Sequence, residues 1–522
     1  MRRIMAEAVR RAYQTGQEDE TLEPLVLVNS EGQPLGRIQS DDSVIFYNIR
    51  GEREIELTQS LTQKGFSEFP VKPGLNLKFV TMIEYQKSLD VQVAFPPEDY
   101  IEDTLSEILS LNKIKQAKIT EAEKAVHVGY FLNGKRENPF AGEERVIVPT
   151  RKNVALFDEA PEMSIEAVAK AIIEKTVSKD IRFIFANLCN VDVVSHIENE
   201  KAVIQAIEAV DRYMGIVVNS ATAAGMTVII TADHGSAERW RYKDGAVDTG
   251  HTDSPVPFIL IDPFDGASLR QGGDLTDIAP TVLDLFGISK PDIMTGCSLI
   301  NRKQAGKAKD SVRLLLILLD GWGISKEGPE NLISQADTPN MDSFLSKFPN
   351  TILRASGEAV GLPAGMVGNS EAGHLHIGVG RKIFADRVRI DRAISDGSFF
   401  KNKAFCNIME NTNRNLHLMG IVSFFSSHGS IHHLFALMEM ARNKGIRKVF
   451  IHAMLGRRGE LPESGARYIE KIEEKAEALG LGLVASVIGR YWPMDREYNW
   501  DRIEKTYRML LQGKGTPVYS VA

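Results

Sequence analysis

Three short apolar runs in this chain lead directly to aspartate or histidine, and this pattern constrains the fold more than any other feature. The runs, with the residues they lead to, are 314–319 with Asp320, 226–231 with Asp233 and His234, and 182–186 with Asp192 and His196. Parallel sheets bury both faces of their strands, so these strands read as continuous apolar runs. The pattern therefore predicts an α/β fold with acidic and imidazole side chains at strand ends.

Strand and helix patterns alternate along the rest of the chain. Further runs that predict strands are 43–49, 75–83, 256–261, 416–422, 448–455 and 482–488, and helical patterns cover 164–177, 201–224 and 463–479. Such alternation is typical of α/β proteins with mostly parallel sheets. A chain of 522 residues exceeds one ordinary hydrophobic core, so we expect two domains.

The aspartates and histidines at strand ends predict a metal-lined crevice, because open α/β sheets bind ligands outside the carboxyl ends of their strands. His251, just before the predicted strand 256–261, is a further candidate ligand. Asp192 and His196 are four residues apart and would share one face of a helix, although a surface pair explains that spacing better when it is taken alone. Mixed Asp and His ligands favour Zn or Mn, since Mg prefers oxygen.

Ser370 lies in a glycine-dense segment, residues 365–380. As a helix cap, it would only accept a backbone hydrogen bond, and the glycines would form a turn. Beside a metal ion it could instead be a nucleophile, because the metal lowers the hydroxyl pKa and a helix amino end favours phosphate. The segment alone leaves both interpretations open.

Five arginines lie in predicted loops that follow strands. They are Arg50, Arg53, Arg458, Arg490 and Arg496. Most arginine side chains lie on a solvated surface. Gathered at one sheet edge of an acidic protein, they would instead form an anion pocket with bidentate contacts to phosphate or carboxylate.

The composition excludes several classes of protein. A net charge of −7 argues against a general nucleic-acid-binding protein. Three widely spaced cysteines fit a reducing compartment without a disulfide framework. No apolar run approaches the roughly 18 residues of a spanning helix, and residues 1–13 predict an amphipathic helix, because acidic residues argue against a transit peptide. We expect a cytoplasmic monomer.

Long motifs over nearly the whole chain resemble the cofactor-independent (2,3-bisphosphoglycerate-independent) phosphoglycerate mutases of the alkaline phosphatase superfamily. They include LLLILLDGWGIS, SGEAVGLPAGMVGNSEAGHLHIGVGR, VIITADHGSAE, GHTDSPVPFIL and MTGCSLI. The resemblance implies two α/β domains. Residues 99–384 would form an alkaline-phosphatase-like, metal-binding domain with a mostly parallel sheet between helices. Residues 1–98 and 385–522 would together form a transferase-like, substrate-binding domain.

The order of these motifs differs from the order in the family. There the DGWG segment lies near the start and the MTGxSLI segment near the end, whereas here residues 294–300 precede Asp320. The polar and basic stretch 301–311 connects them. The chain therefore resembles a circular permutant with this stretch as the fusion linker. Permutation is tolerated where the original ends lie close together at the surface.

The resemblance also assigns roles to residues of this chain. It implies one metal site at Asp320, Ser370, Asp233 and His234, and a second at Asp192, His196 and His251. Ser370 matches the serine that becomes phosphorylated. The substrate pocket maps to His428, Arg458, Arg490, Arg496, Arg50, Arg53 and Lys124. The implied cofactors are two divalent metal ions, with Mn favoured over Mg, Co or Zn, and no 2,3-bisphosphoglycerate.

Two segments depart from the family pattern. The family's SDGGVHSH reads SFFSSHGS at residues 423–430, and its DGRDTPP reads GRRGELP at residues 456–462. The second departure leaves Gly459 where the family has an aspartate that resembles a substrate-orienting group. None of the seven metal ligands is altered. The changes therefore concern the glycerate side of the site more than the phosphoserine chemistry.

The expected activity is the interconversion of 3-phosphoglycerate and 2-phosphoglycerate, in glycolysis and gluconeogenesis, through phosphoserine at Ser370. Such an isomerase would act on a small molecule and would bind neither nucleic acid nor membrane. One alternative is a metal-dependent phosphatase of small phosphorylated metabolites, in which the altered loop lets phosphoserine hydrolyse. Another is a non-catalytic regulatory paralogue, against which the intact metal ligands argue.

Overall fold

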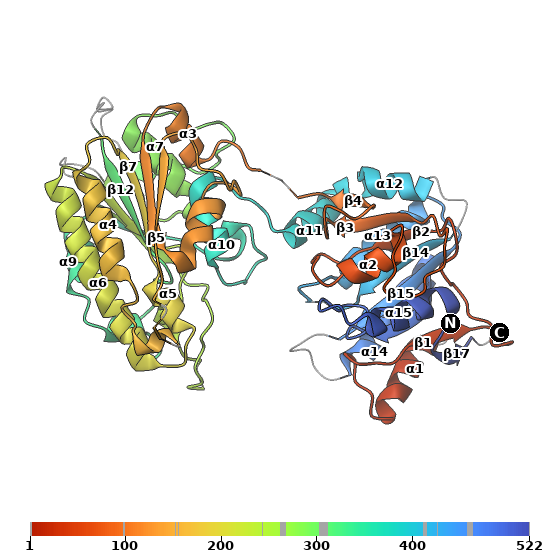
Figure 1. Cartoon of the computed structure of the whole chain (residues 1–522). Helices are drawn as coiled ribbons and strands as arrows, with labels where there is room; N and C mark the ends of the chain where they lie inside the picture. Colours follow the sequence, from red (N-terminus) through yellow and green to blue (C-terminus); the bar gives the residue numbers. More distant parts are fainter. Residues whose placement is uncertain are drawn as a thin grey trace. The chain divides into compact units, whose positions relative to one another are not determined.

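The chain forms two compact units, each with its own hydrophobic core (Figure 1). The computed structural model describes residues 3–97, 100–151, 153–154, 156–242, 244–261, 268–301, 312–410, 415–424, 426–456 and 463–520. Unit 1 comprises Met1–Pro97 and Asp386–Ala522, and unit 2 comprises Glu98–Ala385. The expected linker 301–311 falls outside the described residues except for Asn301.

Unit 2 is built on a seven-stranded sheet between two layers of helices. In spatial order its strands are β13 (Asn350–Leu353), β9 (Val256–Ile261), β8 (Thr227–Thr231), β12 (Leu314–Leu319), β7 (Phe183–Leu188), β5 (Gln116–Glu121) and β6 (Glu143–Val148). The five strands from β8 to β6 are parallel, whereas β9 is antiparallel to β8, and β13 to β9.

Helices cover both faces of this sheet (Figure 1). One layer contains α4 (Ile165–Val177), α6 (Glu200–Ala223) and α9 (Pro339–Lys347). The other contains α3 (Leu105–Leu111), α7 (Ile278–Phe286) and α10 (Ser370–Val379). The short helix α5 (Asn190–Ser195) follows β7.

Unit 1 is built on an eight-stranded, mostly parallel sheet. In spatial order its strands are β17 (Thr516–Tyr519), β1 (Leu25–Val28), β16 (Leu483–Gly489), β15 (Val449–Leu455), β14 (Leu416–Ile421), β2 (Ser43–Phe46), β3 (Lys78–Ile83) and β4 (Gln92–Phe95). The strands from β16 to β4 are parallel, and β1 is antiparallel to β16. Its larger helices are α1 (Ile4–Gln14), α2 (Ile55–Thr62), α11 (Asp386–Asp396), α12 (Lys403–Glu410), α13 (Ile431–Asn443), α14 (Ser464–Leu479) and α15 (Trp500–Gln512).

The apolar runs form the strands that the sequence predicts, which confirms the α/β fold class. The central strand β12 has the same bounds as the predicted run, and all six of its residues are fully buried. The amphipathic helix expected over residues 1–13 is α1. Among the described residues, no helix is long and apolar enough to cross a membrane. The three cysteines are all free.

The topology brings the predicted metal ligands to one edge of the sheet in unit 2. Because β12, β8 and β7 are parallel, their carboxyl ends lie together. His251 precedes its strand, β9, but that strand is antiparallel to β8, so its amino end lies at the same edge. The edge is therefore the place where a ligand should bind.

Candidate metal centre and anion-binding edge

The carboxyl edge of the sheet in unit 2 contains a buried cluster of acidic, imidazole and hydroxyl groups. Asp320 follows β12 directly, Asp233 and His234 follow β8, and Asp192 lies in α5 after β7. All four residues are at most 3% exposed. Buried strands thus end in polar groups that solvent hardly reaches, which makes an interaction partner necessary.

Ser370 and three of these residues form the first group. His234 Nε2 lies 2.9 Å from Ser370 Oγ, and the hydroxyl donates to Asp320 Oδ1 at 3.3 Å. His234 Nε2 is also 3.5 Å from Asp320 Oδ1 and 3.6 Å from Asp233 Oδ2. The structure therefore brings together all four residues expected to form one metal site.

Asp192, His196 and His251 form the second group. Asp192 Oδ1 lies 3.5 Å from His196 Nε2 and 3.2 Å from His251 Nε2, and the two Nε2 atoms are 3.3 Å apart. His196 stands at the end of α5, so the four-residue spacing places both side chains on one face of the helix, as the sequence predicts. The ligand atoms of the three residues are close enough together to hold one metal ion.

The histidine tautomers test whether a cation fits this second group. The Nδ1 atoms of His196 and His251 lie 2.7 Å and 3.0 Å from the carbonyl oxygens of Thr249 and Gly368. A carbonyl can only accept, so each Nδ1 carries the proton. In the neutral rings both Nε2 lone pairs face each other and Asp192, an arrangement that a divalent cation would stabilise, and without a cation Asp192 raises the pKa of both histidines. Donation of the other ring N–H to a carbonyl is usual for metal-binding histidines.

The carboxylates show the same deficit of positive charge. Within the described residues, Asp192 Oδ1 and Asp233 Oδ2 are buried atoms without a hydrogen bond. A buried carboxylate oxygen without a donor is unfavourable unless a cation compensates for it. The residues present therefore fit divalent metal ions at both groups.

Lys124 lies among these carboxylates. Its Nζ donates to Asp192 Oδ2 at 2.7 Å, to Asp320 Oδ1 at 2.8 Å and to Ser370 Oγ at 2.7 Å. Burial opposes the charged form, but Asp320 and Asp192 raise the pKa of Lys124, so it is an ammonium. Burial alone would raise the pKa of Asp192, and the Lys124 charge helps to hold it well below the usual range.

Ser370 is not the cap of its helix. Asn369 occupies the cap position of α10, and its Oδ1 accepts from the Ala372 N–H at 2.8 Å. Ser370 is the first residue of the helix, and its Oγ contacts Lys124 and His234 instead. The capping interpretation of Ser370 is therefore wrong. The hydroxyl lies beside backbone N–H groups at a helix amino end, where a phosphate is favoured.

Three further side chains hold the predicted ligands in place, and the sequence analysis did not single them out. Asn187 Nδ2 donates to Asp320 Oδ2 at 2.7 Å, and His374 Nδ1 donates to the Ser370 carbonyl at 2.9 Å and lies 3.2 Å from Asp233 Oδ2. Glu238 Oε2 accepts from the backbone N–H groups of Ser236 and Gly323 at 2.8 and 3.2 Å. Of the three, His374 had a signal in the sequence, because it is four residues after Ser370 on the same face of α10.

Two glycines allow the ligand loops to pack this closely. Gly321, next to Asp320, has a φ of 80°, and a Cβ atom there would lie 2.9 Å from the Cα atom of Asp192. A Cβ atom on Gly373 would lie 2.6 Å from the Cβ atom of Asp233. Glycine is thus required where α10 and the loop after β12 approach the other ligands.

The carboxyl edge of the sheet in unit 1 contains five of the predicted anion-binding residues, Arg50, Arg53, His428, Arg490 and Arg496. The strands β2, β14, β15 and β16 are parallel, so the loops after them meet there. The Ile49 N–H donates to the His428 carbonyl at 2.7 Å, and Arg53 Nη1 donates to the Met494 carbonyl at 3.1 Å. The loops that contain Arg50, Arg53, His428, Arg490 and Arg496 are therefore linked to one another.

Two of the arginines at this edge, Arg50 and Arg496, are exposed and held loosely compared with the ligands in unit 2. Arg50 pairs with Glu52 at 2.6 Å but its side chain is 51% exposed. The Arg490 side chain, by contrast, is only 12% exposed, and its Nε lies 3.7 Å from Glu20 Oε1. Arg496 is exposed. Arg458 and Gly459 lie outside the described residues.

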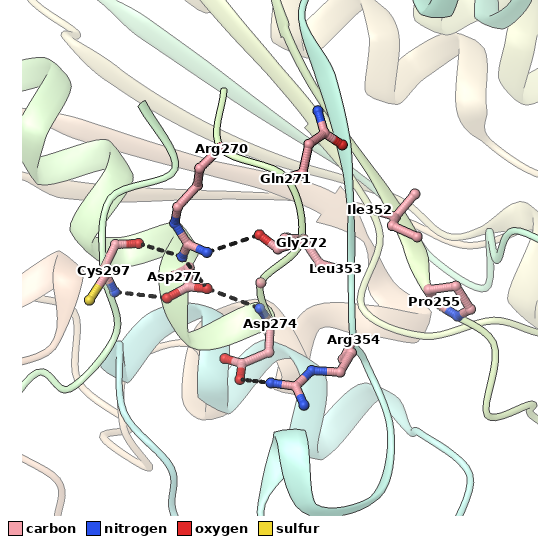
Figure 2. Close-up of a pocket in the computed structure, with 11 residues that line it drawn as sticks. Pro255, Arg270, Gln271, Gly272, Asp274, Asp277, Cys297, Ile352, Leu353 and Arg354 are labelled. Carbon is pink, nitrogen blue, oxygen red and sulfur yellow. Dashed lines mark hydrogen bonds and ion pairs between the residues drawn. The ribbon is translucent and has the colours of Figure 1, made fainter. Parts of the chain in front are cut away.

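A separate hollow in unit 2 lies beside the edge strand β13 (Figure 2). Its charged groups pair with one another: Arg270 with Asp277 at 2.6 Å, and Arg354 with Asp274 at 3.3 Å. The Cys297 N–H donates to Asp277 Oδ1 at 2.8 Å. These pairs connect β13 to the start of α7, and none of the predicted site residues lines the hollow. It is therefore a structural junction.

Comparison with known proteins finds two family profiles in the chain. Residues 21–290 match the profile of the Metalloenzyme superfamily, and residues 390–521 match that of the N-terminus of BPG-independent phosphoglycerate mutases. The chain is similar to 2,3-bisphosphoglycerate-independent phosphoglycerate mutases of Thermomicrobium roseum, at 41% identity over 58% of each chain, and of Moorella thermoacetica, at 41% identity over 56% of this chain and 57% of that protein. A solved structure of Leishmania mexicana phosphoglycerate mutase at low cobalt concentration is 28% identical over 53% of both chains, with a TM-score of 0.38.

These matches each span somewhat more than half the length of the curated relatives. The profile named for an amino terminus matches the carboxyl-terminal part of this chain, after the metalloenzyme match. This reversed order is consistent with the circular permutation expected from the motifs. Because the metalloenzyme profile covers more than half of the 522 residues, the chain belongs to the Metalloenzyme superfamily.

Proposed function

We propose that this protein interconverts 3-phosphoglycerate and 2-phosphoglycerate through phosphoserine at Ser370, without 2,3-bisphosphoglycerate. The observation that carries the proposal is the setting of the Ser370 hydroxyl. It lies at the amino end of α10, 2.7 Å from the Lys124 ammonium and 2.9 Å from His234 Nε2. A phosphoryl group accepted there would meet backbone N–H groups and positive charge.

Two divalent ions, with Mn favoured, would bind the two groups of ligands. Asp320, Ser370, Asp233 and His234 would hold one ion, as the resemblance implies and their contacts support. Asp192, His196 and His251, whose ligand atoms lie close together, would hold the other. Bound ions would stabilise negative charge on the attacking and leaving oxygens during phosphoryl transfer. The carboxylates and bare imidazole nitrogens described above support this assignment.

The side chains of the protein then have separate tasks. Ser370 Oγ gives up its proton and attacks phosphorus in line, the bond to the glycerate oxygen breaks, and that oxygen gains one proton, so the transfer releases none overall. Lys124 stabilises the negative charge that develops on the seryl oxygen, because its Nζ already contacts that atom. His428, Arg50, Arg53, Arg458, Arg490 and Arg496 would bind the glycerate while it reorients, and the phosphoryl group would then return to the other hydroxyl.

One incubation separates this function from the alternatives. Purified protein loaded with Mn is mixed with 3-phosphoglycerate, and 2-phosphoglycerate and free phosphate are measured together. We expect 2-phosphoglycerate as the main product. Free phosphate as the main product would show a phosphatase. Neither product from metal-loaded protein would favour the non-catalytic paralogue.

A further inference from the structure

Glu54 is a buried carboxylate at the carboxyl edge of unit 1, among the residues proposed to bind the glycerate. It follows Arg53 and directly precedes α2. Its side chain is fully buried, whereas that of Arg50 is 51% exposed. Burial of a carboxylate is unfavourable unless hydrogen bonds or charges compensate for it. The partners of Glu54 therefore indicate what it does.

Three groups face this carboxylate. Asn48 Nδ2 donates to Glu54 Oε1 at 2.6 Å, and the Arg53 backbone N–H donates to Oε2 at 3.1 Å. His428 Nδ1 lies 3.4 Å from Oε1. Burial raises the pKa of Glu54, and His428 and Asn48 act against that rise. The carboxylate thus connects the loop after β2 to the loop after β14.

A role in helix capping does not explain this arrangement. Glu54 stands at the cap position of α2, but its side chain makes no capping hydrogen bond to the helix. The carboxylate turns instead toward Asn48, whose Oδ1 accepts from the Ile421 N–H at 2.8 Å. Asn48 therefore anchors Glu54 to the end of β14, on the side where His428 lies.

The imidazole of His428 depends on this carboxylate. Its backbone is fixed, because its N–H donates to Ser426 Oγ at 3.0 Å and its carbonyl accepts from Ile49 at 2.7 Å. Within the described residues its Nδ1 is a buried atom without a regular hydrogen bond, and the Glu54 oxygen is the acceptor it faces. The ring torsion and the tautomer are thus what Glu54 can set.

We propose that Glu54 is a positioning residue that directs the Nδ1–H of His428 toward its carboxylate and so leaves Nε2 to contact the phosphoglycerate. A carboxylate behind a histidine selects one tautomer and stabilises the protonated ring. This inference rests on the proposed function, because it gives Glu54 a part in the same reaction. Glu54 would act only through His428 and would not touch the substrate.

The test compares Glu54→Gln and Glu54→Asp with the control Glu473→Gln. Glu473 is a carboxylate of unit 1 that accepts two backbone N–H groups, from Met5 and Ala6, and faces no histidine in the described residues. Nitrogen-15 shifts of labelled histidine, assigned with His428→Gln, report the tautomer of His428. The pH profile of kcat/KM for 3-phosphoglycerate reports whether the reaction depends on the protonation of His428. Thermal unfolding checks that each variant is folded.

We expect Glu54→Gln to change the His428 tautomer and lower kcat/KM about tenfold, as for loss of one hydrogen bond to a charged group. Glu54→Asp should keep the tautomer and recover part of the activity, and Glu473→Gln should change neither readout. An unchanged tautomer in Glu54→Gln, or a changed tautomer with unchanged kcat/KM, overturns the inference. Absence of 2-phosphoglycerate from unmodified protein overturns the proposed function instead, and the tautomer still reports whether Glu54 sets the ring.

Discussion

The carboxyl edges of the two sheets hold their functional groups in different ways. In unit 2, the side chains of Asp192, Asp320 and Ser370 are at most 5% exposed and all contact the Lys124 ammonium. In unit 1, long arginine side chains project from loops, and that of Arg50 is 51% exposed. Packing fixes the first set in advance, whereas the exposed Arg50 and Arg496 keep rotamer freedom until an anion binds.

This difference indicates a division of work between the units. Fixed and buried groups suit chemistry in which charge must be stabilised without reorganisation. Side chains that can change rotamer suit a substrate that must change its orientation while it stays bound. Changes in unit 2 should therefore affect isomerisation and hydrolysis alike, whereas changes in unit 1 should alter the ratio between them.

The largest effect is expected from Ser370→Ala, which removes the nucleophile from the fixed set. Formation of 2-phosphoglycerate and release of phosphate should both fall by at least about a thousandfold, because both pass through phosphoserine. The exposed Ser346→Ala in α9 is the control and should change neither rate. Turnover in Ser370→Ala comparable with that of unmodified protein would contradict the phosphoserine mechanism.

The next effect is expected from His251→Ala, which removes one of the two facing imidazoles. The bound metal should fall from two ions to one, and both activities should fall about a hundredfold or more. Elemental analysis of the dialysed protein measures the metal, and His432→Ala, an exposed histidine in α13, is the control. An active protein that binds no divalent ion would refute the metal assignment.

The sequence predicts most of the apolar strands, although the short run β1 was missed, and it gives no signal where a buried strand is polar. β12 and β8 were predicted because their residues form continuous apolar runs. β5 was not predicted, since Gln116, Lys118 and Glu121 read as surface residues although all three are buried. Lys118 is tolerated there because it lies 3.4 Å from Glu143 of β6. A pairing between strands is not visible in a pattern along one strand.

The same limit applies to the site. The expected metal ligands could be found because they follow apolar runs, and parallel topology then places them together. Asn187 was missed because it lies within β7, where an amide gives no sign of its contact with Asp320. Lys124 has no local signal at all, and only the family resemblance pointed to it. Its contacts are with Asp192, Asp320 and Ser370, which come from three segments far apart in the sequence.

A smaller effect is expected from Gly459→Asp, which tests the recognition side of the comparison. An aspartate there would offer an acceptor to a glycerate hydroxyl, a bond to a charged group worth roughly 1.5–3 kcal/mol, or about one to two powers of ten in rate. The ratio of isomerisation to phosphate release should rise accordingly, and Gly459→Asn, without the charge, is the control.

Two other residues of unit 1, Phe424 and Glu54, bear on this result. The ring of Phe424 packs against Tyr468 and His432, with centroids 5.3 and 5.5 Å apart, so α13 and α14 hold it. If Glu54 already orients the substrate through His428, the gain from Gly459→Asp should be larger in the Glu54→Gln background. Rapid isomerisation with no phosphate release by unmodified protein would show that the glycerate is held firmly without an aspartate at position 459.

The smallest effect concerns stability, and it arises from a buried chain of hydrogen bonds in unit 1. His417 Nε2 lies 3.0 Å from Asp42 Oδ2, His417 Nδ1 lies 3.0 Å from His452 Nε2, and His452 Nδ1 lies 2.8 Å from Ser486 Oγ. Burial lowers the pKa of both histidines, that of His452 well below its usual range. The charged groups that face them are Asp42, which opposes the shift of His417, and Arg37, which lowers both values.

Because these histidines are neutral when folded but titrate near pH 6.5 when unfolded, the unfolded state binds more protons as the pH falls below about 6.5. Unit 1 should therefore lose stability from pH 6.5 downward, by about 1.4 kcal/mol for each unit of pKa depression. Urea unfolding in a Trp240→Phe, Trp322→Phe background follows Trp492 and Trp500, which belong to unit 1, so metal release from unit 2 does not enter the signal. His452→Asn should flatten this pH dependence and lower the stability at pH 8 by about 1–3 kcal/mol, because it breaks the chain. Equal pH dependence in both proteins would show that the chain does not govern the acid stability of unit 1.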